Sequence, residues 1–314
     1  VWPDGAGVVN GRRCVRGVPR LTPGSAPRTT IVMVRSYAAA RTPVEYFATL
    51  VQSDGGFPRC EAAARVAQDD YPDLDMQQLF NDMDLLQARL QRRLDADMPA
   101  LQRLYALNQF FFADLGFGGN LNDYYDPENS YLHTVLRTRR GIPITLGLLW
   151  MELAHSAGLQ VQGVAFPGHF MVKALLPPGQ VLMDPFTGQS LSREELSERL
   201  EPYQRHGAPS ESDAALAIHL QAATPRDILA RLLRNLKEIH QSQQDWLRLI
   251  AVQNRLVVLL PLAWCEWRDR GLAHAACGHA AQALADLELY LAHTDAQDAE
   301  AVHARICALR RTAN

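Results

Sequence analysis

The amino-acid sequence predicts an α+β fold, in which helices accompany a small antiparallel sheet and an all-helical segment follows. Three observations support this fold class. Apolar residues recur at spacings of three and four in residues 75–94 and fill nearly every position of 144–154, which indicates an amphipathic helix and then a buried one. Strand-like runs are confined to 159–184. Helical patterns resume at residue 224 and continue to the end of the chain.

The segment before the strands is predicted to be helical over residues 43–114. Asp75 and Asp97 are plausible N-caps for two of its helices, over 75–94 and 97–117. Glycines, asparagines and a proline then predict a loop over 116–130. The buried helix that follows has Pro143 in its first turn and ends at Gly158.

A β-hairpin is the centre of the predicted sheet. Pro178-Gly179 suits the middle of a type II turn. With that turn, Asp184 pairs opposite Lys173, and a bulge or a shorter loop is needed to bring Asp184 to His169. The predicted strands are 159–166, 170–176 and 181–184.

The rest of the chain is predicted to be helical around a polar linker. Ser192 with Glu195 forms a capping box, and Thr224 is a strong helix start before Pro225. Small and large residues in the C-terminal part fall at the spacings typical of a tetratricopeptide unit, in which small residues allow close helix packing. These residues are Trp267, Gly271, His274, Gly278, Ala283 and Leu287.

Composition narrows the class of protein. The net charge of −3 argues against a nucleic-acid or anionic-membrane partner, and no apolar run is long enough to cross a bilayer. The five cysteines include no CxxC pair, which favours a reducing cytoplasm. His274 and His279 are five residues apart, which is unfavourable for a metal pair on one helix face, so neither a metal site nor a cofactor is predicted. Residues 1–32 are predicted to be a disordered tail.

His169 and Asp184 are the candidate catalytic pair. A His that opens one strand and an Asp that closes the next, after a helix entered through a glycine turn, resemble the papain-like core of transglutaminases. In that family a Cys at the helix N-terminus attacks, the His takes its proton and the Asp orients the His. The resemblance places Pro143 where the family has its Cys, so the nucleophile is missing.

The whole pattern resembles the bacterial SirB-type family, which joins a transglutaminase-like core to tetratricopeptide repeats. The segments that carry the resemblance are "NDYYDPENSYLHTVLRTRRGIPITLGLLW", "GVAFPGHFMVK" and "LMDPFTG". It implies four parts: a disordered tail over 1–32, a transglutaminase-like domain over 33–205, a linker over 206–223 and a tetratricopeptide-like helical domain over 224–314.

Further site candidates surround this pair, each with a plainer alternative. Thr145 carries the hydroxyl nearest to the missing nucleophile, although a threonine there more often bonds to the backbone. Arg137, Arg139 and Arg140 form a basic cluster just before the core helix, which could hold an acidic ligand group near the helix N-terminus or simply be a solvated face. Tyr124 and Asn129 could line the rim of a cleft, although Asx turns explain an asparagine equally well.

Two main functions follow as hypotheses. The first is a non-catalytic protein that binds a protein partner through repeats 224–314, in a regulatory or scaffolding role. The second is a hydrolase or acyl-transfer enzyme that uses His169 and Asp184 with a non-cysteine nucleophile or an activated water. A third and weaker one is a small-ligand sensor that uses the former cleft.

Overall fold

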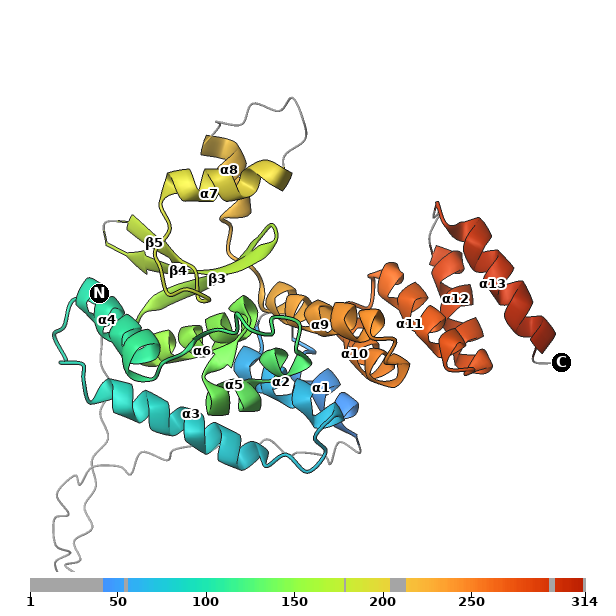
Figure 1. Ribbon diagram of the computed structural model, residues 1–314, viewed down its shortest axis with the longest axis horizontal. Helices are drawn as coiled ribbons and strands as arrows, with labels where there is room; N and C mark the ends of the chain where they lie inside the picture. The colour runs from blue at the N-terminus through green and yellow to red at the C-terminus, as the bar shows by residue number, and fades with distance from the viewer. Residues whose placement is uncertain (1–41, 54–55, 178, 204–212, 294–296, 313–314) are drawn as a thin grey trace, which may run out of the picture. The chain divides into compact units, whose positions relative to one another are not determined.

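The computed structural model describes residues 42–53, 56–177, 179–203, 213–293 and 297–312. The predicted disordered tail, residues 1–32, lies outside the described residues, as does most of the polar part of the predicted linker. Figure 1 shows helices on both sides of one small sheet and a run of helices towards the C-terminus, so the predicted α+β fold class is confirmed.

Helices form most of the chain before the sheet. Asp75 caps its helix as predicted, because its side chain accepts a hydrogen bond from the Gln78 backbone N–H at 3.0 Å. The next helix begins at Ala100 after Pro99 and not at Asp97, and it continues as a π-helix, Gln109–Asp114. The α-helices are α1 (Pro43–Leu50), α2 (Arg59–Ala64), α3 (Met76–Gln91), α4 (Ala100–Asn108), α5 (Leu132–Thr138) and α6 (Pro143–Ser156). Short 3-10 turns cover Arg65–Asp69, Pro127–Ser130 and Glu201–Tyr203.

The main sheet is antiparallel, with the strand order β3-β4-β5. Its strands are β3 (Gln160–Phe166), β4 (His169–Leu176) and β5 (Gly179–Met183), and a two-residue parallel pair joins β1 (Gly118–Gly119) to β2 (Arg140–Gly141). The predicted hairpin register is wrong by two residues, because Lys173 pairs with Leu182. Gly179 pairs with Leu176 and so belongs to the strand, not to the centre of the turn. The turn therefore lies one residue earlier in the chain than predicted, which moves Asp184 two residues closer to His169 along the paired strand.

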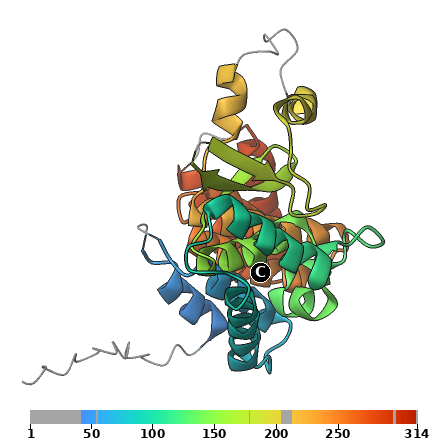
Figure 2. The ribbon, with the colours of Figure 1, turned by 90° about the vertical axis from the view of Figure 1, so that its left-hand side faces the viewer.

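The buried helix α6 lies against the sheet (Figure 2). Gly147 allows this close packing, because a Cβ there would be 2.6 Å from the Phe170 ring of β4. Burial around the helix is nearly complete, since every residue from Pro143 to Met151 is buried. The strong apolar run of the sequence therefore becomes the centre of the core.

Helices α7 to α13 follow the sheet. The capping box predicted at Ser192 and the helix start predicted at Thr224 are both formed, and Thr224 also forms a capping box with Asp227. Leu232 and Leu236 of α9 and Leu256 of α10 join the same hydrophobic core as α6. The bounds are α7 (Arg193–Leu200), α8 (Asp213–His219), α9 (Pro225–Ser242), α10 (Trp246–Leu259), α11 (Trp264–Ala276), α12 (Ala280–His293) and α13 (Ala299–Thr312).

The helices α11 and α12 form the predicted repeat pair. Gly271 of α11 approaches Leu287 of α12 so closely that a Cβ on Gly271 would be 2.9 Å from the leucine side chain. An ion cluster joins α9 to α11, since Lys237 lies 2.5 Å from Glu266 and 2.6 Å from Asp269, and Arg234 lies 2.9 Å from Glu266. No described helix is long and apolar enough to cross a membrane.

Candidate functional site

His169 is positioned by the tight turn between β3 and β4. Phe166 and His169 are paired across the strands, so only Pro167 and Gly168 form the turn. Gly168 has a φ of +68°, which a glycine adopts without strain. A Cβ at Gly168 would also overlap the Tyr203 hydroxyl. The imidazole therefore stands at a fixed strand end, with about a quarter of its side chain exposed, at 24 %.

Asp184 follows β5 directly and holds the imidazole. Its Oδ1 lies 2.8 Å from His169 Nε2 and accepts the Phe186 backbone N–H at 2.9 Å, and its Oδ2 accepts Arg199 Nη1 at 3.2 Å. Burial alone would raise the pKa of this carboxyl. The hydrogen bonds from His169, Phe186 and Arg199 outweigh it and hold the pKa of Asp184 below its ordinary value. The carboxylate therefore stays ionised and orients the ring.

The N-terminus of α6 supplies no nucleophile. Pro143 occupies the first helical position and is buried. Thr145, the nearest hydroxyl along this helix, is fully buried, with its Oγ1 2.8 Å from the Asn129 carbonyl and 3.0 Å from the Ile142 carbonyl. Thr145 thus stabilises the start of the helix through backbone bonds.

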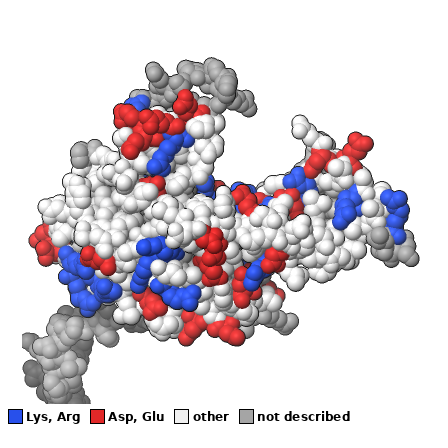
Figure 3. Space-filling model, in the orientation of Figure 1, with Lys and Arg blue, Asp and Glu red and all other residues white. Residues whose placement is uncertain are grey.

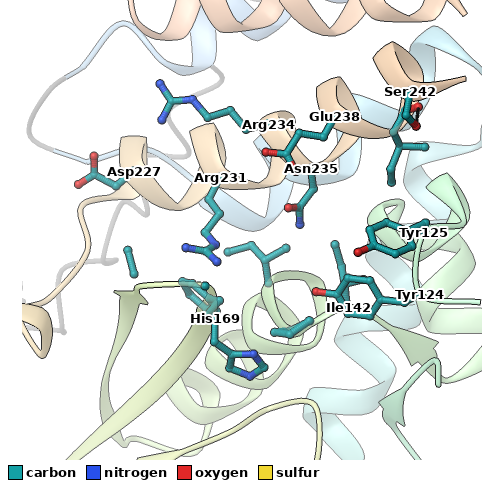
Figure 4. A pocket seen from close by; sticks show the side chains of 16 residues that line it. Tyr124, Tyr125, Ile142, His169, Asp227, Arg231, Arg234, Asn235, Glu238 and Ser242 are labelled. Atoms are coloured by element: carbon teal, nitrogen blue, oxygen red, sulfur yellow. Dashed lines mark hydrogen bonds between the residues drawn. The ribbon is translucent and has the colours of Figure 1, made fainter. Parts of the chain in front are cut away.

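A pocket of about 810 Å³ opens beside His169, between the start of α6 and one face of α9 (Figure 4). Polar residues of α9 recur at spacings of three and four, so one helix face forms this wall. The lining residues from α9 include Asp227, Arg231, Asn235, Glu238 and Ser242. The opposite side is lined by Tyr124, Tyr125, Ile142, Pro143, Ile144, His169 and Phe170.

Arg231 is the cation closest to the pair in this pocket, and Figure 4 shows its side chain directed towards His169. Its Nη1 donates a hydrogen bond to the Phe166 carbonyl at 3.2 Å, and within the described chain it forms no ion pair with a carboxylate. Burial lowers the pKa of Arg231, and Tyr124 and Glu238 oppose this effect. A guanidinium with free N–H groups in a pocket can bind a carboxylate or a phosphate.

The structure brings only part of the predicted set together. His169 and Tyr124 line the pocket, and Asp184 is bound to His169 without lining the pocket itself. Asn129 is buried, and its amide donates to the Asp123 carbonyl at 2.6 Å, so it shapes the loop. Arg140 donates to the Gly116 and Arg139 carbonyls and does not line the pocket.

Two residues at the site escaped prediction from sequence. Arg199 reaches Asp184 from α7, and Arg231 reaches the pocket from α9. The only sequence signal for Arg231 is the polar stripe on α9. This stripe did not indicate a cleft, because the sequence assigns the helix to the repeats and not to the wall of the pocket.

His274 and His279 are closer than their spacing suggested, since their Nδ1 atoms lie 3.2 Å apart. The reason is that α11 ends at Ala276, so the two residues are not on one continuous helix. Among the described residues, no group of three or more His, Cys, Asp or Glu side chains could hold a metal ion.

Comparisons with known proteins agree with this architecture. The family described as "Transglutaminase-like superfamily" matches residues 77–234, and the "Tetratricopeptide repeat" family matches residues 236–307. A UPF0162 protein of Xylella fastidiosa (strain Temecula1) is 39% identical over 243 residues, which cover 76% of this chain and 84% of the relative. No solved structure matches the chain.

More distant relatives carry the same name. A UPF0162 protein of Pseudomonas aeruginosa is 31% identical over 67% of this chain and 75% of its own length. The UPF0162 protein YchA of Escherichia coli K12 is 26% identical over 74% of this chain and 86% of its own length.

Proposed function

Because the chain belongs to the UPF0162 family and joins a transglutaminase-like domain to tetratricopeptide helices, we propose that it is a non-catalytic binding protein with a regulatory or scaffolding role. A protein partner binds the helical repeats of residues 224–314. The division into parts at 33–205, 206–223 and 224–314, the kinship with SirB-type proteins and the cytoplasmic location belong to this proposal.

One observation carries the proposal: the helix start beside His169 offers no attacking atom. Pro143 has neither a thiol nor a hydroxyl, and the Thr145 hydroxyl is fully buried against backbone carbonyls. None of the described cysteines lines the pocket. Ser242 does line it, but its hydroxyl donates to the Ile239 carbonyl, and Figure 4 places it at the far end of α9 from Arg231.

The repeat surface offers apolar side chains to a partner. Leu262, in the turn between α10 and α11, is 78% exposed, and Leu247 at the start of α10 is 69% exposed. Contiguous exposed apolar patches mark protein interaction sites, and these leucines would belong to such a site on the repeats. We expect the partner to contact the turn between α10 and α11, around Leu262.

A second candidate function is catalysis by His169 and Asp184. His169 and Asp184 retain their hydrogen bond, and within the described chain His169 Nδ1 has no partner and adjoins the pocket. Such a pair could activate a water for hydrolysis or acyl transfer. The retained pair is the specific observation in favour of an enzyme.

Amide hydrolysis and amine incorporation with glutamine-containing peptides separate the two candidates. We expect no turnover by the wild type, turnover by Pro143→Cys, and loss of that gained turnover in the double variant Pro143→Cys/His169→Ala. The gain is expected because a helix N-terminus and an adjacent imidazole lower the pKa of a thiol. Wild-type turnover that His169→Ala abolishes would establish the enzyme instead.

Partner binding needs point variants, because deletion of 224–314 would also remove α9 and α10 from the main core. Affinity capture with the full chain should lose its specific partner in Leu262→Asp and keep it in Tyr105→Asp, a matched control on α4 that is 65% exposed. Equal capture by both variants would place the partner site elsewhere.

A further inference from the structure

A second pocket, lined by four arginines, lies between α3 and α5. It has a volume of about 610 Å³. Residues of α3 that recur at spacings of three and four form one wall, and the end of α5 forms the other. The arginines are Arg89, Arg92, Arg137 and Arg139. Figure 3 shows Lys and Arg side chains gathered on the face that carries these helices.

None of the four guanidinium groups has a hydrogen bond or an ion pair with a described residue. The contrast with Arg93 is direct, because Arg93 is adjacent in sequence to Arg92 and is paired with Asp114. Arg139 is the most constrained of the four, since its Nη1 is buried without a partner and its guanidinium lies 4.6 Å from the centre of the Phe117 ring. Buried donors without partners are rare in folded proteins.

The backbone at Arg139 is also held in an unfavourable conformation. Its φ is 61°, in the left-handed region at the end of α5, where a non-glycine residue costs about 1 kcal/mol or more. Burial, together with Arg89, lowers the pKa of Arg139, while Asp82 opposes this effect. A strained and desolvated cation without a hydrogen-bond or ion-pair partner for its guanidinium is typical of a binding position.

The charges that line the pocket indicate what charge a complementary ligand would carry. The C-termini of α3 and α5 each supply about half a negative charge, and Asp82 supplies one more. About two of the four positive charges therefore remain uncompensated. Asp75 also lines the pocket but caps the other end of α3, fourteen residues from Arg89, or about 21 Å along the helix. At that distance water and salt screen its charge.

We propose that this pocket binds a small phosphate-bearing anion. A phosphate group carries nearly two negative charges, which matches the charge surplus, and its three strong acceptor oxygens can bind several of the four guanidinium groups. A single carboxylate has one charge and two oxygens and would leave about half of the surplus. Leu79, Leu86 and Leu136 line the remaining wall and would pack against an apolar part of the same ligand.

Isothermal titration calorimetry with pyrophosphate tests the proposal on the full chain. We expect saturable binding that weakens as NaCl is raised, and at least tenfold weaker binding in Arg92→Gln and in Arg139→Asn. Asparagine is chosen at 139 because it tolerates a positive φ. Arg305→Gln removes one exposed, unpaired arginine from α13 and should leave the affinity unchanged. Thermal melts confirm that each variant is folded.

Further probes identify the ligand class. Inorganic phosphate, pyrophosphate and ATP separate a free phosphate site from one that holds a larger phosphorylated molecule, and citrate tests for charge alone. The absence of binding by every phosphate probe overturns the proposal. Citrate binding as tight as that of pyrophosphate, or equal weakening by Arg305→Gln, also overturns it.

Discussion

Three donors converge on the carboxylate of Asp184, which is 2% exposed as a residue. Together they hold its pKa below the ordinary value of 3.8. A group whose pKa is lower in the folded state stabilises the fold above its unfolded pKa, and this contribution is lost as the pH falls through the folded pKa. Asp184 is thus a source of acid lability whether or not the protein is an enzyme.

Asp184→Asn is therefore expected to make the unfolding free energy less dependent on pH in the acid range. The variant should lose about 2 kcal/mol of unfolding free energy at pH 7, because charge-assisted hydrogen bonds are lost. The difference from the wild type should begin to shrink below about pH 4, where the carboxyl of the unfolded state becomes protonated, and should shrink further as the pH falls through the lower pKa of the folded state. Urea unfolding at pH 7, 5 and 3 measures both. A difference that is constant over this range would mean that Asp184 is not ionised in the folded state.

Asp184 stabilises the fold at neutral pH, whereas the backbone conformation of Arg139 and the burial of its guanidinium both oppose folding. Arg139→Gly is expected to raise the melting temperature by about 2–4 °C, which corresponds to about 1 kcal/mol for a domain of this size. Gln244→Gly is the matched control, because Gln244 also has a positive φ, of 57°, but is exposed. A gain at Gln244 that equals the gain at Arg139 would assign the whole effect to the backbone and none to the guanidinium.

Sequence identified His169 and Asp184 because the pair is local. Both belong to a single hairpin, so their spacing is set by one short loop. Arg231 and Arg199 could not be predicted in the same way, because their positions depend on how α9 and α7 dock on the sheet. Helix caps at Asp75, Ser192 and Thr224 were predictable for the same local reason.

At the scale of elements, the packing of α6 on β4 depends on one missing side chain. Glycine within a helix usually costs about 1 kcal/mol relative to alanine. At Gly147 glycine is more favourable than alanine, because a Cβ would lie 2.6 Å from the ring of Phe170 and 3.3 Å from Val172. Gly147→Ala is expected to destabilise the protein by about 1–3 kcal/mol.

Gly179→Ala is the control for that substitution, since nothing lies within 4 Å of a Cβ at Gly179. Chemical denaturation of both variants checks the contrast. An increase in stability from Gly147→Ala would show that the helix shifts easily on the sheet and that the contact is not tight.

The register of the hairpin was mispredicted for an element-scale reason. Proline and glycine preferences indicate a turn, but they do not say which residues remain paired on either side of it. Here Gly179 pairs with Leu176, so the turn lies one residue earlier in the chain than a type II turn centred on Pro178 and Gly179 would. The helical repeat was easier to predict because close helix packing needs small residues at fixed spacings, as Gly271 against Leu287 illustrates.

At the scale of the molecule, a buried ion pair joins α10 to the first helices. Arg255 is fully buried and binds Asp69 through two hydrogen bonds of 2.7 and 2.8 Å. The two residues are 186 positions apart. Arg255 lies in the segment that matches the tetratricopeptide repeat family, and Asp69 lies just before the segment that matches the transglutaminase-like family. The hydrophobic core joins both matched segments, since it contains Leu146 of α6 and Leu256 of α10.

Arg255→Met is expected to lower the unfolding free energy by about 3 kcal/mol, because it leaves Asp69 without its partner. Unfolding, monitored by circular dichroism, should remain a single transition. Arg248→Met breaks the neighbouring exposed pair with Asp70 and should cost less than about 1 kcal/mol. If Arg255→Met produced two separate transitions, the two segments would be independently stable.

The double role of α9 has a consequence for regulation. One face of this helix lines the pocket of His169, and its Arg234 and Lys237 are bound to Glu266 and Asp269 of α11. A partner that displaces α11 therefore also shifts the wall that carries Arg231, and an occupant of the pocket resists that shift. Thermodynamic linkage makes such coupling reciprocal. Binding in the pocket and binding of the partner would therefore change each other's affinity by the same factor, through α9 alone.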